Sequence, residues 1–131
     1  MSDEPADGVT TGPGYSVSAL DLLGEGYGFR KIRTPMGLTA FGANAIVLPP
    51  DYTSKKHFHE EQEELYFVHA GLIEISFDDG TTHLLGPGGL AWAAPHTVRQ
   101  LKNVGEGPAV YVAIGGKDGY VPRDGRPGDS A

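Results

Sequence analysis

Short apolar segments separated by turn-forming residues are the dominant pattern between positions 38 and 114. The segment 65–77, LYFVHAGLIEISF, is rich in β-branched and aromatic residues, and Gly71 at its centre predicts a bend within it. Further apolar or alternating segments lie at 38–48, 81–85, 90–93, 97–101 and 109–114. Strand signals at intervals of about 8–12 residues, with turn chemistry between them, indicate an antiparallel sandwich or barrel. The pattern therefore predicts an all-β protein, with one weak helical segment at 18–23.

Composition supports strands and turns, because the 131 residues include 20 Gly and 10 Pro, the two poorest helix formers. The sequence divides into one ordered domain over 15–115 and two polar, Gly/Pro-rich ends. We predict a flexible N-terminal tail over 1–14 and a flexible C-terminal tail over 116–131, since neither segment has enough apolar residues to fold alone. Deletion of 1–12 and 122–131 is therefore expected to leave the thermal midpoint nearly unchanged.

Charge and cysteine content exclude several classes of function. With 10 Lys and Arg against 17 Asp and Glu, the formal net charge is −7, which argues against binding to nucleic acid or to an anionic membrane. The chain has no cysteine, so any metal must be held by histidine, carboxylate or backbone oxygen. No basic, apolar leader and no long apolar run is present, and we place the protein in the cytoplasm.

A histidine pair and a carboxylate follow each other at the spacing of a metal site. His57 and His59 are two residues apart, so on a strand both side chains point to one face. An acidic loop follows, and the chain returns with Glu64, which we predict to lie opposite the histidines across a hairpin. Two histidines and one carboxylate form the facial ligand set of many non-haem metal sites. The alternative is that HxH occurs by chance next to a solvated acidic turn.

The same segment resembles the first motif of the cupin superfamily, G-x5-H-x-H-x3–4-E-x6-G. Asp51 stands at the first glycine position, His57 and His59 match, and Gly71 matches the last glycine. Glu64 is the carboxylate that keeps the six-residue spacing to Gly71, whereas Glu63 would have the opposite strand parity. The resemblance covers roughly residues 38–115.

The second cupin motif, G-x5-P-x-G-x2-H-x3-N, is matched only in part. With Gly88 as its first glycine, Asn103 matches without a gap, His96 falls on the second glycine and Arg99 falls on the histidine position. Arginine has no lone pair for a metal, so the usual third histidine ligand is missing in this register. The alternative is a shortened turn that makes His96 the ligand. Because side chains on a strand alternate between its two faces, Arg99, four residues before Asn103, lies on the same face as Asn103, whereas His96 lies on the opposite face. This alternation favours Arg99 as the inward residue.

The resemblance implies a single small cupin, a conical antiparallel β-barrel or jelly roll, as a homodimer that covers exposed sheet edges. It implies one divalent metal ion (Fe, Mn, Ni or Zn) on His57, His59 and Glu64, and oxygenase- or isomerase-type chemistry on a small polar or anionic molecule. Arg99, His96 and Tyr66 are the predicted substrate-binding residues. The alternative function is a non-catalytic small-molecule binding or sensor cupin with a degenerate, metal-free site, in which Arg99 pairs with Glu64.

Overall fold

The computed structural model describes residues 8–128, and strands account for most of its regular structure. The strands are β1 (Thr10–Gly12), β2 (Tyr15–Val17), β3 (Gly28–Lys31), β4 (Gly42–Leu48), β5 (His57–His59), β6 (Glu63–Ala70), β7 (Ile73–Phe77), β8 (Thr82–Leu85), β9 (Leu90–Ala93), β10 (Arg99–Asn103), β11 (Ala109–Gly116) and β12 (Gly125–Pro127). The helices are a 3-10 turn, Leu20–Leu22, and α1, Arg33–Met36. Neither of these described helices is long or apolar enough to cross a membrane.

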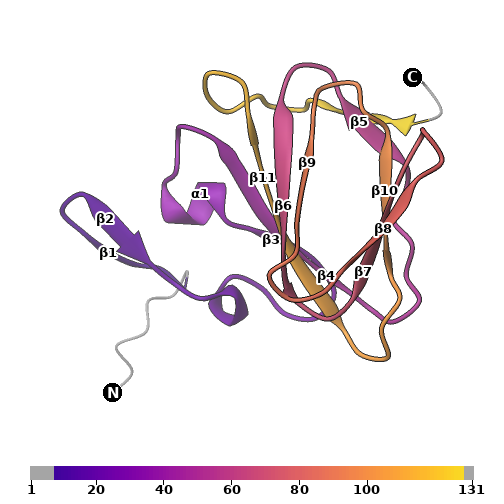
Figure 1. Ribbon diagram of the computed structural model, residues 1–131. Helices are drawn as coiled ribbons and strands as arrows, with labels where there is room; N and C mark the ends of the chain where they lie inside the picture. The colour runs from indigo at the N-terminus through magenta and orange to yellow at the C-terminus, as the bar shows by residue number, and fades with distance from the viewer. Residues whose placement is uncertain (1–7, 129–131) are drawn as a thin grey trace.

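Two five-stranded sheets face each other and form the body of the molecule (Figure 1). One sheet has the order β12-β5-β10-β7-β8, the other has the order β3-β4-β11-β6-β9, and the strand pairs in both are antiparallel. The hairpin of β1 and β2 projects from the side of this body (Figure 1). The predicted all-β jelly roll is therefore confirmed.

Alternation along β6 shows how the sequence fills the space between the sheets. Tyr66 and Val68 point inward and are almost completely buried, whereas Leu65 and Phe67 lie on the outer face. The inward residues pack with apolar residues of both sheets, namely Ile46, Leu48, Ile73, Ile75, Leu101, Ala109 and Tyr111. Because side chains on a strand alternate with a period of two, the inward parity of Tyr66 also directs Glu64 into the interior.

The predicted bend at Gly71 is a corner at which the chain changes sheets. Strand β6 ends at Ala70 in one sheet, and β7 begins at Ile73 in the other. Gly71 has a φ of +84°, and a Cβ at this position would lie 2.7 Å from the Cα of Ala109. Glycine is required here by both the left-handed backbone and the close approach of another chain segment.

Residues 117–128, which we call the C-terminal strap, run across one end of the two sheets (Figure 1). The Arg33 guanidinium carbon lies 3.7 Å from the centre of the Tyr120 ring, and β12 at the other end of the strap pairs with β5. The sequence places this segment in a flexible tail, and the domain boundaries remain a prediction. The described strap residues nevertheless make specific contacts with the jelly roll.

Candidate metal centre

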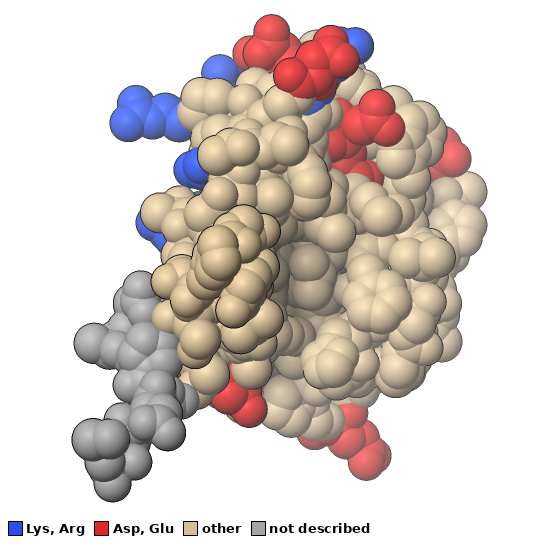
Figure 2. All heavy atoms as spheres, turned by 90° about the vertical axis from the view of Figure 1, so that its left-hand side faces the viewer, with Lys and Arg blue, Asp and Glu red and all other residues tan. Residues whose placement is uncertain are grey.

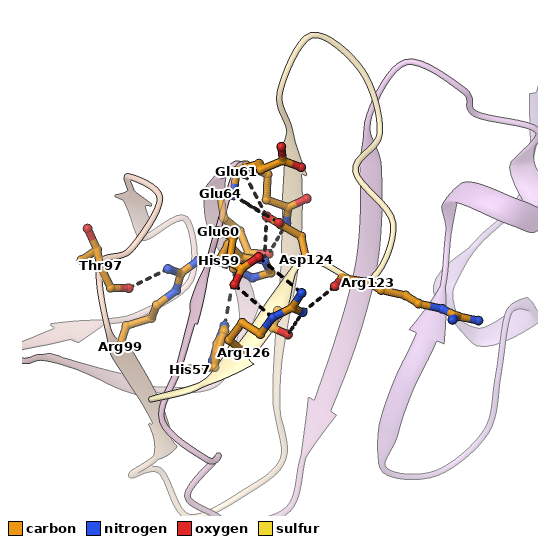
Figure 3. Close-up of polar contacts among 12 residues, drawn as sticks. His57, His59, Glu60, Glu61, Glu64, Thr97, Arg99, Arg123, Asp124 and Arg126 are labelled. Carbon is orange, nitrogen blue, oxygen red and sulfur yellow. Dashed lines mark hydrogen bonds and ion pairs between the residues drawn. The ribbon is translucent and has the colours of Figure 1, made fainter. Parts of the chain in front are cut away.

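Three side chains predicted as metal ligands converge in the interior near the strap (Figure 3). His57 and His59 lie on β5, and Phe58 between them is buried on the opposite side of the strand. Glu64 Oε1 lies 3.7 Å from His57 Nε2 and 3.4 Å from His59 Nε2. One ligand atom from each of the three residues can be chosen so that all lie within 4.8 Å of one another.

The route by which the three residues meet differs from the predicted hairpin. Strand β5 pairs with β10 and β12, whereas Glu64 on β6 pairs with β11 and β9 in the facing sheet. The histidines and the carboxylate therefore meet across the interior of the jelly roll. Strand pairing does not fix their separation, which depends on the packing of the two sheets.

Opposing effects act on the ionisation of Glu64. Burial raises the pKa of its carboxyl group, but hydrogen bonding with His57 and His59, the charge of His59 and the Tyr66 hydroxyl outweigh burial. The net result is a pKa well below the usual range, so the group is a carboxylate at neutral pH. An ionised carboxylate is the form that a metal cation binds.

Tyr66 connects the carboxylate to Arg99. Its hydroxyl donates a hydrogen bond to Glu64 Oε1, accepts one from Arg99 Nε at 2.9 Å, and lies 3.2 Å from His57 Nε2. Burial and the negative charge of Glu64 raise the pKa of the Tyr66 hydroxyl well above its ordinary value, so it remains a proton donor. Tyr66, predicted as a substrate-binding residue, thus directly contacts the candidate ligands.

Arg99 is the inward residue of its strand, as the gap-free motif register predicts. The side chain is completely buried, with Nη2 donating to Glu64 Oε1 at 3.0 Å and Nη1 donating to the Thr97 carbonyl at 2.7 Å. All three guanidinium nitrogens therefore bond to the protein, and Arg99 does not line the cavity beside the histidines. These contacts suit a cation that positions Glu64 and Tyr66.

His96 lies in the turn before β10 and does not join the ligand cluster. It is exposed, and its ring stacks on Phe58 on the side of β5 away from Glu64, with ring centres 5.9 Å apart. Its φ of +69° is the left-handed conformation that glycine favours, and His96 occupies the glycine position of the motif. The backbone geometry therefore agrees with the register that makes Arg99 the inward residue.

Two further residues contact the cluster, and the sequence did not reveal either of them. Asp124 on the strap is buried, and Oδ2 accepts the Gln62 backbone N–H at 2.8 Å and lies 3.7 Å from His59 Nδ1. The Gln62 side chain is also buried, with Nε2 lying 3.4 Å from Glu64 Oε2. Asp124 has no sequence signal beyond its place in a turn-like Arg-Asp-Gly, and Gln62 has none within the acidic loop.

A cavity of about 500 Å³ opens beside the cluster. His57, His59, Glu64 and Tyr66 lie on its wall together with the strap from Tyr120 to Pro127. Lys55, Lys56 and Arg126 also line it, so the cavity wall carries cationic groups as well as the carboxylates of Glu64 and Asp124. The volume suits a small molecule.

The donor set fits one divalent transition-metal ion. Ligand atoms bonded at about 2.1 Å to a single ion lie roughly 3.0–3.4 Å apart, close to the 3.4 and 3.7 Å between Glu64 Oε1 and the two histidine nitrogens. Because Arg99 supplies no lone pair, the protein offers three ligands and leaves the remaining positions open.

A family model for the cupin domain matches residues 45–115, more than half of the chain. The protein therefore belongs to the cupin superfamily, and the match includes all three candidate ligands and Arg99. Comparison of the sequence with curated proteins finds no match.

Two of the solved structures similar to this chain are described as cupins. A sugar phosphate isomerase from a cupin superfamily of Silicibacter pomeroyi is 29% identical, with a TM-score of 0.62, over 68% of this chain and 58% of that protein. This chain thus matches less than two thirds of that protein's length. A cupin protein from Bacteroides fragilis is 21% identical, with a TM-score of 0.68, over 80% of this chain and 86% of that protein. At this level of identity, the similarity supports the fold alone.

Proposed function

We propose that this protein is a metal-binding cupin that acts on a small anionic molecule, with His57, His59 and Glu64 as the metal ligands. The observation that carries the proposal is the convergence of two imidazole nitrogens and one ionised carboxylate beside a small-molecule cavity. When bound there, a divalent ion supplies Lewis-acid chemistry. Tyr66 and Arg99 hold the Glu64 carboxylate, and the strap closes one side of the cavity.

A phosphorylated sugar is the substrate class that we propose, with isomerase-type chemistry. The support is the 29% identity to the Silicibacter pomeroyi sugar phosphate isomerase, together with Lys55, Lys56 and Arg126 at the cavity. Cationic side chains favour an anionic group such as phosphate. Arg99 is a predicted substrate-binding residue, but each of its three guanidinium nitrogens donates a hydrogen bond to a protein group, and in this proposal it positions the metal ligand.

Metal content should depend on the three ligand residues. Tag-free protein is expected to bind close to one equivalent of Fe(II), Mn(II), Ni(II) or Zn(II), and His59→Ala or Glu64→Gln should abolish that binding because two ligands cannot hold the ion. His83→Ala is the matched control, since His83 is exposed on β8, outside the cluster. Elemental analysis after gel filtration measures the ratio, and equal metal content in all four proteins would contradict the assigned ligands.

Ligand affinity should depend on the phosphate group. In calorimetric titrations of the metal-loaded protein, glucose 6-phosphate is expected to bind at least about tenfold more tightly than glucose, since charge-assisted hydrogen bonds exceed neutral ones. Replacement of both Lys55 and Lys56 by glutamine should reduce that difference and leave glucose binding unchanged. Equal affinities for the two sugars would contradict the proposed substrate class.

The second candidate is a metal-free binding or sensor cupin, and the Arg99–Glu64 contact favours it. Nη2 of Arg99 lies 3.0 Å from the same carboxylate oxygen that faces both histidines, so the guanidinium already neutralises this carboxylate. Wild-type protein that rejects all four added metal ions would support this function and contradict the metal-dependent one.

A homodimer remains part of the proposal. The side of the molecule that bears the β1–β2 hairpin is largely free of charged groups and is hollowed near its centre (Figure 2). On the outer face of the β3-β4-β11-β6-β9 sheet, a groove of about 680 Å³ is lined in part by Leu20, Val47, Phe67 and Val112. A second copy of the chain would cover this groove, whose lining also includes the ion pair of Asp21 and Arg30, in keeping with the expected cupin dimer.

A further inference from the structure

Asp124 is a buried carboxylate that the proposed ligand set does not use. It lies on the C-terminal strap, and its two oxygens accept the backbone N–H groups of Glu61 and Gln62 at 2.8–3.1 Å. These contacts fix the carboxylate at the turn between β5 and β6. Figure 3 shows it beside His59, whereas the side chain of Arg123 points away from the cluster.

His59 lies between two carboxylates. Its Nε2 is 3.4 Å from Glu64 Oε1, and its Nδ1 is 3.7 Å from Asp124 Oδ2. Nδ1 is sealed from solvent and has no hydrogen-bond partner among the described residues. The distance to Asp124 is about 0.8 Å longer than a typical N–H···O hydrogen bond, so the two groups interact here through charge and not through a formed hydrogen bond.

The position of Asp124 decides which nitrogen of His59 carries the proton. A lone pair on Nδ1 would face the negative charge of Asp124 in a buried place, whereas a proton on Nδ1 would be attracted to it. A neutral imidazole has a single N–H, so a proton on Nδ1 leaves the lone pair of Nε2 directed at Glu64 and the centre of the cluster. A histidine that binds a metal through Nε2 needs this tautomer.

We propose that Asp124 is a positioning residue that holds His59 in its metal-binding tautomer and orientation, an inference that rests on the proposed function. The effect is specific to one histidine. The side chain of His59 is 12% exposed, that of His57 is 30% exposed, and no ion pair within residues 8–128 reaches His57 Nδ1. Through Asp124, the strap thereby contacts one of the proposed metal ligands, His59.

The first test compares the Zn(II) affinity of three proteins by competition with a chelating dye. Asp124→Asn preserves the size of the side chain and an oxygen for the backbone N–H groups, but it removes the charge opposite Nδ1. Its affinity is expected to fall about tenfold to a hundredfold, the range typical of lost partners of metal-bound histidines. Asp118→Asn is the control, because it makes the same chemical change at an exposed carboxylate of the strap that does not line the cavity. Its affinity should stay within threefold of wild type.

The second test uses only the wild-type protein, so it does not depend on whether a variant folds. In ¹⁵N-labelled, Zn(II)-loaded wild-type protein, the His59 Nδ1–H proton is expected far downfield and slow to exchange, whereas that of the more exposed His57 exchanges faster. A fast-exchanging His59 proton, or Asp124→Asn with wild-type affinity, would overturn the role of Asp124 and leave the metal site intact. Wild-type protein that binds no Zn(II) would instead overturn the proposed function and this inference together.

Discussion

Replacement of Arg99 by methionine is expected to lower the free energy of unfolding by about 3–5 kcal/mol, the usual cost of removing one partner of a buried ion pair. Arg99 is completely buried and donates hydrogen bonds to Glu64, Tyr66 and the Thr97 carbonyl. Methionine fills similar space but leaves the Glu64 carboxylate without its cation. Urea unfolding in the presence of a chelator measures the loss without a metal ion replacing the missing charge.

Two companion variants make this result specific to the buried pair. Arg126→Gln removes an ion pair whose side chains are 42% and 48% exposed, so its loss should not exceed about 1 kcal/mol. Adding Glu64→Gln to Arg99→Met should recover much of the lost stability, because no unpaired charge then remains. A loss in Arg99→Met no larger than that in Arg126→Gln would show that the buried pair does not stabilise the fold.

A chain that ends at Val121 is expected to unfold with a free energy about 3–6 kcal/mol lower than a chain that ends at Gly128. The shorter chain lacks the β12–β5 pairing and the Asp124 hydrogen bonds to the Glu61 and Gln62 backbone. Hydrogen bonds to charged groups contribute about 1.5–3 kcal/mol each. Loss of Asp124 also leaves two backbone donors at the β5–β6 turn without an acceptor.

The two truncated chains differ only by the segment 122–128, so thermal and urea unfolding report its contribution directly. Composition alone predicts that deleting both 1–12 and 122–131 leaves the thermal midpoint nearly unchanged. Equal midpoints for the two chains would support that expectation and show that the strap contacts add no stability. Asp124→Asn in the full chain is the intermediate case, since it preserves β12.

The features that the sequence predicted well depend on local periodicity and spacing. Alternation along 63–70 places Glu64 and Tyr66 on one face, and the two-residue spacing of His57 and His59 places both imidazoles on one side of β5. The motif spacing also identified Arg99 as the inward residue on β10. These assignments succeed because the direction of a side chain on a strand depends mainly on its own and adjacent positions.

The sequence by itself determined the all-β fold, the cupin resemblance and the faces on which the candidate ligands lie. Only the tertiary structure decided that Glu64 lies in the sheet opposite the histidines. It also decided that Arg99 donates hydrogen bonds to Glu64 and Tyr66, and that Asp124 on the strap lies next to His59. Asp124 is 65 positions away from His59 in the chain, and no periodic pattern connects them. Contacts of this kind depend on how two sheets and a terminal segment pack, which local patterns do not encode.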